Sequence, residues 1–189
     1  MNILLFLKTK HRKTKRMHKQ GFTLIEALVA ASILAVTLTA LMNVMAQNVF
    51  NASYTKNKTV ATLLAQEGVE LVRNIQDSVL LDTPFDDVGT FGSYLILNSS
   101  LASCLTGDDC YIDPLNLDVL PCGGECPNLR LSFDGFYDYE ELGTETIFRR
   151  VISLEPITQG VVRVTVEVFW SQGQTEASVD YQMDLFPWI

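Results

Sequence analysis

The chain has 189 residues, 48% of them hydrophobic, which is enough for one packed domain and excludes global disorder. Its formal charge of −8 hides an uneven distribution, because residues 1–21 hold seven basic and no acidic residues, whereas residues 22–189 hold seven basic and all 22 acidic residues. The excess of acidic residues in 22–189 argues against a domain that binds nucleic acid through phosphate contacts, so no nucleic-acid partner is expected.

The basic segment, residues 1–21, directly precedes a long apolar run. Basic residues beside an apolar segment stay on the cytoplasmic side of a membrane. A basic arm that binds nucleic acid is the alternative, but the adjoining apolar run favours the membrane interpretation. Both histidines, His11 and His18, also lie here, so the remainder of the chain has none for a catalytic triad or metal site. We therefore predict no enzymatic activity and no cofactor.

The apolar run covers residues 22–45 and contains a single charged residue, Glu26. A helix of that length spans about 36 Å, which exceeds the roughly 30 Å of a bilayer's hydrocarbon core. A carboxylate in such a segment is costly and suggests a function with a specific partner, although a position near the lipid headgroups would make it cheaper. The sequence therefore predicts a transmembrane helix over residues 22–45.

Residues 19–26, Lys-Gln-Gly-Phe-Thr-Leu-Ile-Glu, resemble the cleavage and methylation motif of type IV prepilins. The resemblance implies that a prepilin peptidase cuts after Gly21 and that the new amino-terminal residue, Phe22, is N-methylated. It also implies that Glu26 pairs with the terminal amine of a neighbouring subunit, a cation that suits a carboxylate in a low dielectric. The implied partners are the peptidase, other pilin or pseudopilin subunits, and the membrane.

The leader implied by this cut, residues 1–21, is longer than most leaders of the family. Met17 offers a second start, which would give the short leader Met17–Gly21. Our hypothesis is that Met17 is the true start or that residues 1–16 are dispensable. Sequencing the unprocessed protein from a peptidase-deficient strain decides between them, because a peptide beginning at Met1 excludes the shorter start.

Residues 46–81 change from uniformly apolar to periodic, which predicts that the same helix continues as an amphipathic segment to about Leu80. Gly68 falls on the apolar stripe, where a close approach of a sheet would explain it. The stripe comprises Val60, Leu64, Leu71, Val72, Ile75 and Val79, and the polar side comprises Gln66, Glu70, Arg73 and Asp77.

Residues 82–143 hold four of the six prolines and seven of the 11 glycines, so they are predicted to form loops with short strands near residues 93–97 and 129–133. The segment also contains a group of four aspartates, for which a solvated loop is favoured over a calcium site because no EF-hand spacing is present. These are Asp108, Asp109, Asp113 and Asp118.

All four cysteines lie in the same segment, at Cys104, Cys110, Cys122 and Cys126. An even number of cysteines outside the cytoplasm predicts disulfides, and three pairings are possible. A zinc site is the alternative, but the two tight cysteine pairs that such sites commonly use are absent.

Residues 144–189 are predicted to form an antiparallel sheet. Apolar residues alternate with polar ones from Val162 to Trp170 and again from Ala177 to Leu185, with a turn at residues 171–174 between them. Thr146–Leu154 is a plausible third strand. Three strands packed on the amphipathic helix give an α+β fold, the overall shape of the pilin family.

The leading functional hypothesis is a structural subunit, a minor pilin or pseudopilin, of a type IV pilus or a type II secretion-like filament. It would wait in the cytoplasmic membrane with its globular part outside and then enter an extracellular filament. A tip subunit that binds a ligand through residues 98–128 is one alternative. The other is a membrane-anchored extracytoplasmic protein that enters no filament.

Overall fold

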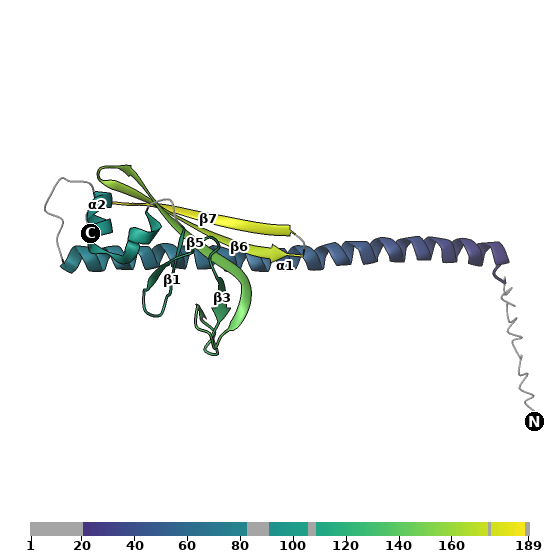
Figure 1. Ribbon diagram of the computed structural model, residues 1–189. Helices are drawn as coiled ribbons and strands as arrows, with labels where there is room; N and C mark the ends of the chain where they lie inside the picture. Colours follow the sequence, from purple (N-terminus) through teal and green to yellow (C-terminus); the bar gives the residue numbers. More distant parts are fainter. Residues whose placement is uncertain (1–20, 83–90, 106–108, 174, 188–189) are drawn as a thin grey trace, which may run out of the picture. The chain divides into compact units, whose positions relative to one another are not determined.

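The computed structural model describes residues 21–82, 91–105, 109–173 and 175–187. They form a long amino-terminal helix packed against an antiparallel sheet, which confirms the predicted α+β fold (Figure 1). The chain divides into two compact units, residues 1–48 and 49–189, and the first helix contributes to both. The helices are α1 (Leu24–Asp82), α2 (Phe91–Asn98) and the 3-10 helix η1 (Ser100–Cys104). The strands are β1 (Cys110–Ile112), β2 (Val119–Pro121), β3 (Asn128–Leu131), β4 (Tyr137–Asp138), β5 (Thr144–Thr158), β6 (Val161–Gln172) and β7 (Thr175–Leu185).

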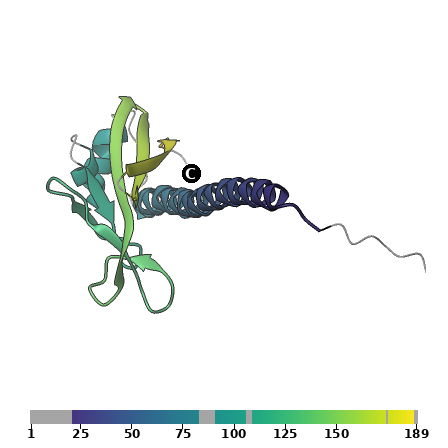
Figure 2. The ribbon, with the colours of Figure 1, turned by 90° about the vertical axis from the view of Figure 1, so that its right-hand side faces the viewer.

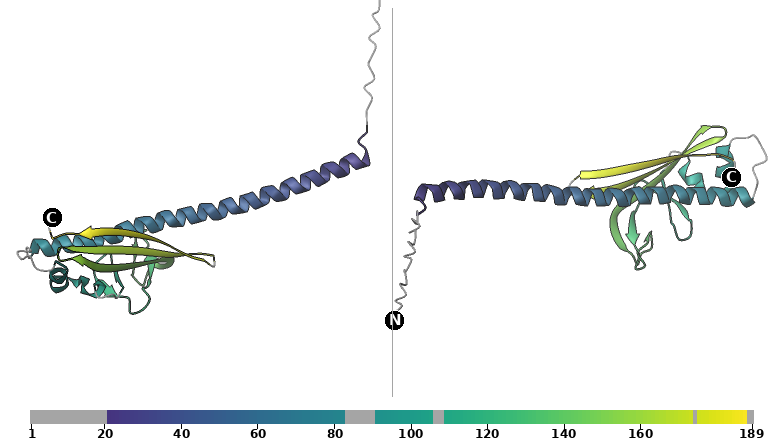
Figure 3. Two further views of the ribbon diagram at one scale, coloured as in Figure 1. Left: turned by 90° about the horizontal axis from the view of Figure 1, so that it is seen from above. Right: turned by 180° about the vertical axis from the view of Figure 1, so that it is seen from behind.

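Three long strands, β5, β6 and β7, form the main part of the sheet as an antiparallel meander. The alternation read from the sequence is confirmed in β6, where every second residue from Val162 to Trp170 is buried and the alternate residues are partly exposed. Gly173 adopts a positive φ of 66° in the turn to β7, a conformation that glycine adopts without steric cost. The strands lie along the second half of α1 and cover one side of it (Figures 2 and 3).

The shorter strands join the sheet along the other edge of β5. Cys110 of β1 pairs with Ile152, and β3 pairs with the beginning of β5, from Thr144 to Arg149. The outermost strands on this side are β2, which pairs with β1, and β4, which pairs with β3. A single long strand, β5, therefore aligns two separate hairpins.

The core lies between the sheet and one face of α1, from Ala61 to Leu80. The predicted stripe is confirmed for Leu64, Val72 and Ile75, but the buried face also includes two alanines, Ala61 and Ala65. Small side chains let the sheet approach the helix closely. The one buried polar residue of this face that the structure describes, Gln76, donates a hydrogen bond of 2.6 Å to the carbonyl oxygen of Phe186.

Gly68 marks the closest approach of helix and sheet. A Cβ atom at this position would lie 2.8 Å from Cγ1 of Val166 and 3.0 Å from Cδ of Arg150. Real Cβ atoms essentially never come within 3.0 Å of another heavy atom, so any residue other than glycine here would force the Val166 side chain to shift. The glycine that weakens the helix is thus explained by packing.

Arg150 of β5 enters the core beside Gly68 and is fully buried. Its guanidinium donates hydrogen bonds to the carbonyl oxygens of Leu64 and Ile112, at 3.3 and 3.1 Å, and to the carboxylate of Glu67 at 3.0 Å. A buried cation is stable only when it is paired and hydrogen-bonded. Arg150 therefore ties α1, β1 and β5 together.

The prediction of a strand at residues 93–97 is wrong, because these residues belong to α2. Phe91 and Leu95 are four residues apart and are both fully buried, which is the spacing of one helical face. A short apolar run does not distinguish a strand from a buried helix, and here the tertiary contacts favour the helix. The second short strand is confirmed as β3, at residues 128–131.

Candidate functional site

The candidate site is the beginning of α1, where the predicted cleavage, methylation and assembly residues follow one another. Gly21 and Phe22 precede the helix, and Phe22 is 79% exposed. No heavy atom lies within 4 Å of a Cβ built on Gly21. Among the described residues, no other part of the chain covers the Gly21–Phe22 peptide bond.

Thr23 is the capping residue that begins α1. The amide of Glu26 lies 3.4 Å from the Thr23 hydroxyl and 3.1 Å from its carbonyl oxygen, and the amide of Ala27 lies 3.2 Å from the same carbonyl. A threonine followed three residues later by glutamate is the pattern of a capping box, which the sequence contains and which could have located the helix start. Thr23 is therefore a functional-site residue that motif reading overlooked.

Glu26 occupies the first turn of α1 and is exposed. The free amide groups of a helix's first turn carry partial positive charge, so a carboxylate there is stabilised. This local effect offsets part of the cost of a charge in an apolar segment. Because Glu26 is exposed, its carboxylate also remains accessible to a cation, such as the amine that the predicted cleavage would create on a neighbouring subunit.

Residues 24–50 of α1 are all exposed in the structure. They include an 18-residue window with a mean hydropathy of 2.2, which is long and apolar enough to cross a membrane. The hydroxyls of Ser32, Thr37 and Thr39 donate hydrogen bonds of 2.8–2.9 Å to carbonyl oxygens three residues earlier. These hydroxyl groups therefore have hydrogen-bond partners within the helix. In an apolar environment, where no water is available, polar groups require such partners.

The four cysteines form two disulfides, Cys104–Cys110 and Cys122–Cys126. The first joins the end of η1 to the beginning of β1. The second closes a small loop through Gly123 and Gly124, whose φ values of 63° and 128° reverse the chain. No free cysteine remains among the described residues, so a cysteine zinc site is not formed.

The predicted acidic group is used for turns in the part that the structure describes. The Asp113 carboxylate accepts a hydrogen bond from the amide of Leu115, and the Asp118 carboxylate accepts one from the Asn116 side chain. The described residues contain no cluster of three or more side chains suited to a metal ion. Asp108 lies outside the described residues.

The geometry defines a class of protein: a globular α+β unit carried by one amino-terminal apolar helix that fits a membrane anchor. Residues 16–42 match the family model of the prokaryotic N-terminal methylation motif. This match supports a type IV prepilin-like protein, and the motif implies processing by a prepilin peptidase and assembly with other pilins. No curated protein and no solved structure matches the chain.

Proposed function

We propose that the chain is a structural, non-enzymatic subunit of a type IV pilus or a type II secretion-like filament, in the role of a minor pilin or pseudopilin. The observation that carries this proposal is the methylation motif leading directly into an apolar helix, whose residues 24–50 are all exposed in the part of the chain that the structure describes. Such a surface requires lipid before assembly and other apolar helices afterwards.

In this proposal the peptidase cuts between Gly21 and Phe22 and Phe22 is methylated. Cleavage removes the seven basic residues of the leader and leaves a chain with seven basic and 22 acidic residues. Glu26 then pairs with the terminal amine of a neighbouring subunit. The globular unit lies outside the cytoplasmic membrane, a location supported by its two disulfides, because disulfides persist in oxidising compartments.

Mass spectrometry of the mature protein tests the processing steps. The expected amino-terminal peptide begins with N-methylated Phe22. A mature protein that retains residues before Phe22, or one whose Phe22 is unmodified, would contradict this part of the proposal.

The substitution Glu26→Gln tests assembly, because it keeps the size of the side chain and removes its charge. We expect normal cleavage and loss of the variant from sheared filaments. Asn43→Ala is the matched control, since Asn43 is a polar residue of the same exposed helical segment and has no proposed partner. If Glu26→Gln enters filaments as the wild type does, Glu26 has no role in assembly.

The minor role is tested by abundance. Quantitative mass spectrometry of sheared filaments should find this chain as a small fraction of the filament protein. A filament composed mainly of this chain would identify it as the major subunit instead.

A further inference from the structure

The chain between β3 and β5 forms a projecting segment that exposes large apolar side chains. We name residues 132–143 the aromatic lobe. Phe133 is 94% exposed, Phe136 66% and Leu142 81%. Large apolar side chains that stay in water forgo the free energy of burial, so three of them within this short segment make it a candidate interaction site.

Hydrogen bonds give the aromatic lobe a defined shape. Two hydrogen bonds join Ser132 and Phe136. The Ser132 amide donates to the Phe136 carbonyl oxygen at 2.8 Å, and the Phe136 amide donates to the Ser132 hydroxyl at 3.2 Å. In the second turn, the Arg130 guanidinium donates to the carbonyl oxygens of Glu141 and Gly143. Hydrogen bonds therefore hold the backbone that carries the exposed apolar side chains.

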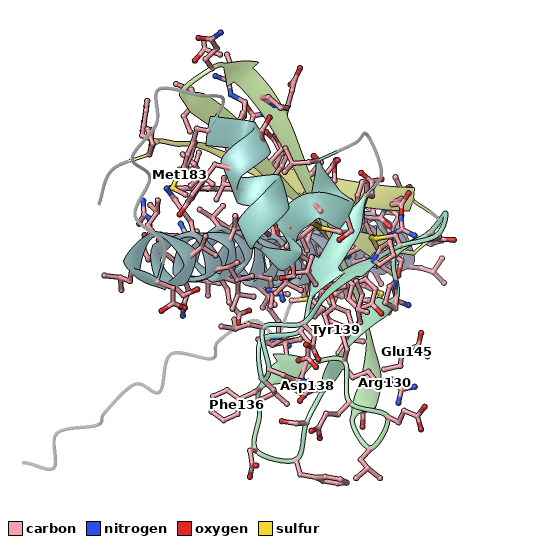
Figure 4. All side chains as sticks on the ribbon, turned by 60° about the vertical axis from the view of Figure 1, so that its left-hand side comes forward. Arg130, Phe136, Asp138, Tyr139, Glu145 and Met183 are labelled. Carbon is pink, nitrogen blue, oxygen red and sulfur yellow. A yellow bond between two sulfur atoms is a disulfide. The ribbon has the colours of Figure 1, made fainter. Side chains whose placement is uncertain are left out.

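A groove of about 320 Å³ separates the aromatic lobe from α1. Its walls are mainly apolar and include Val60 and Leu63 of α1 and Phe136 and Tyr137 of the lobe. The charged residue of its lining, Glu67, is already bound to Arg150. Figure 4 shows Phe136 on one side of the lobe and Arg130 and Glu145 on the other. The groove thus offers an apolar slot beside a helix, a shape that suits side chains of a second helix.

The charge around the groove limits what can occupy it. Asp134, Glu140 and Glu141 are exposed on the aromatic lobe, and residues 132–143 contain no lysine or arginine. Residues 49–189 hold 21 acidic and seven basic residues, so the globular unit of a second copy would bring further negative charge to this surface. Like charges brought together destabilise a contact, whereas basic groups beside the lobe stabilise it.

We propose that the groove and the aromatic lobe form a docking surface for a different prepilin-like subunit. The apolar amino-terminal helix of that subunit lies in the groove, against Leu63 and Phe136. Basic groups on the same subunit face Asp134, Glu140 and Glu141. This inference rests on the proposed filament function. It identifies the surface that selects the neighbouring subunit, and it explains by charge why that neighbour is not a second copy of this chain.

Site-specific photo-crosslinking in the native cell tests the proposal with the full chain. A benzophenone amino acid replaces Phe136, filaments are sheared, irradiated and digested, and the adducts are sequenced by mass spectrometry. The expected adduct joins position 136 to the apolar amino-terminal helix of a different chain that carries a methylation motif. The control places the probe at Ile147, which is 43% exposed in β5 and does not line the groove, and it should give no such adduct.

The charge requirement is tested in the same material. The double substitution Glu140→Gln, Glu141→Gln in the probe-bearing chain should lower the yield of the adduct, because it removes two of the three carboxylates. An adduct with a second copy, an adduct with a protein that lacks the motif, or no adduct in filaments that contain the chain would overturn the docking proposal. Absence of the wild-type chain from every filament fraction would instead refute the filament function itself, and with it this inference.

Discussion

The two halves of α1 have the same secondary structure and opposite relations to their surroundings. Residues 24–50 are apolar on every side, and none of them is buried. Residues 61–80 are apolar on one side, and the chain's own sheet covers that side. A helix that is hydrophobic all round must be buried by something outside its chain, whereas an amphipathic helix finds its cover within the fold. One helix thus serves both as an anchor and as the core of a domain.

The largest expected effect compares one leucine from each half. Leu64→Ala should lower the free energy of unfolding by about 3 kcal/mol, because Leu64 is only 4% exposed and its loss leaves a cavity. The matched change Leu34→Ala should cost less than about 0.5 kcal/mol, because Leu34 is 59% exposed. Guanidinium unfolding of the full chain in mild detergent, followed by near-ultraviolet circular dichroism, measures both. If the two variants lowered the free energy of unfolding equally, the proposed difference between the two halves of α1 would be wrong.

The second effect is a dependence on pH in the globular unit. Burial raises the pKa of Tyr139 to about 12, against the opposing influence of the nearby Arg150 guanidinium. Because the pKa is higher in the folded chain, its contribution is fully present below pH 10 and is lost as pH rises from 10 to 12. The loss should be on the order of 3 kcal/mol.

Tyr139→Phe is the control for this pH dependence. It removes the ionisable hydroxyl and keeps the ring, so the steep loss between pH 10 and 12 should disappear. Unfolding measured at several pH values makes the comparison. A variant that keeps the same loss would assign it to another group.

A smaller effect concerns Gly68, which the sheet approaches most closely. Helix propensity alone predicts that Gly68→Ala stabilises the helix by about 1 kcal/mol. The contact with Val166 predicts the opposite, since overpacking costs about 1–3 kcal/mol, so we expect a net destabilisation of about 1 kcal/mol. The double variant Gly68→Ala, Val166→Ala should show a favourable coupling between the two sites, measured as a double-mutant cycle. A stabilised single variant would contradict the observed closeness.

The smallest effect concerns an ion pair on the outer face of the sheet. Arg163 donates hydrogen bonds to both carboxylate oxygens of Asp184, at 2.8 and 3.2 Å, and thereby lowers the pKa of Asp184. The pair's contribution is present above the ordinary aspartate pKa and is lost as pH falls through the lowered value. Titration of Asp184 by nuclear magnetic resonance should show a low midpoint that returns to the ordinary range in Arg163→Gln. Because both side chains are partly exposed, the effect on stability should be slight.

The features that follow from local chemistry could be read from the sequence alone. The apolar run, the methylation motif and the alternation in β6 each involve residues that are close together in the sequence. The side chains of a helix or strand meet the same environment at a fixed period, so such patterns can be recognised without the fold. The long helix and the sheet were therefore predictable. The roles of Gly21, Phe22 and Glu26 rest on the motif and stay predictions about processing and assembly.

Only the tertiary structure decided which distant groups meet. The helical state of residues 91–98, the burial of Arg150 and the groove beside Phe136 depend on contacts between residues far apart in the chain. The cysteines pair with near neighbours, six and four residues apart, but the sequence left three pairings open and the fold selects one of them. Arg150 shows the reason most directly: it alternates in step with the buried Phe148 and Ile152, but nothing near it in the sequence shows which groups would pair with its charge. Its place in the core exists because Leu64, Glu67 and Ile112 supply hydrogen-bond acceptors from two other elements, and because Gly68 leaves the space that it occupies.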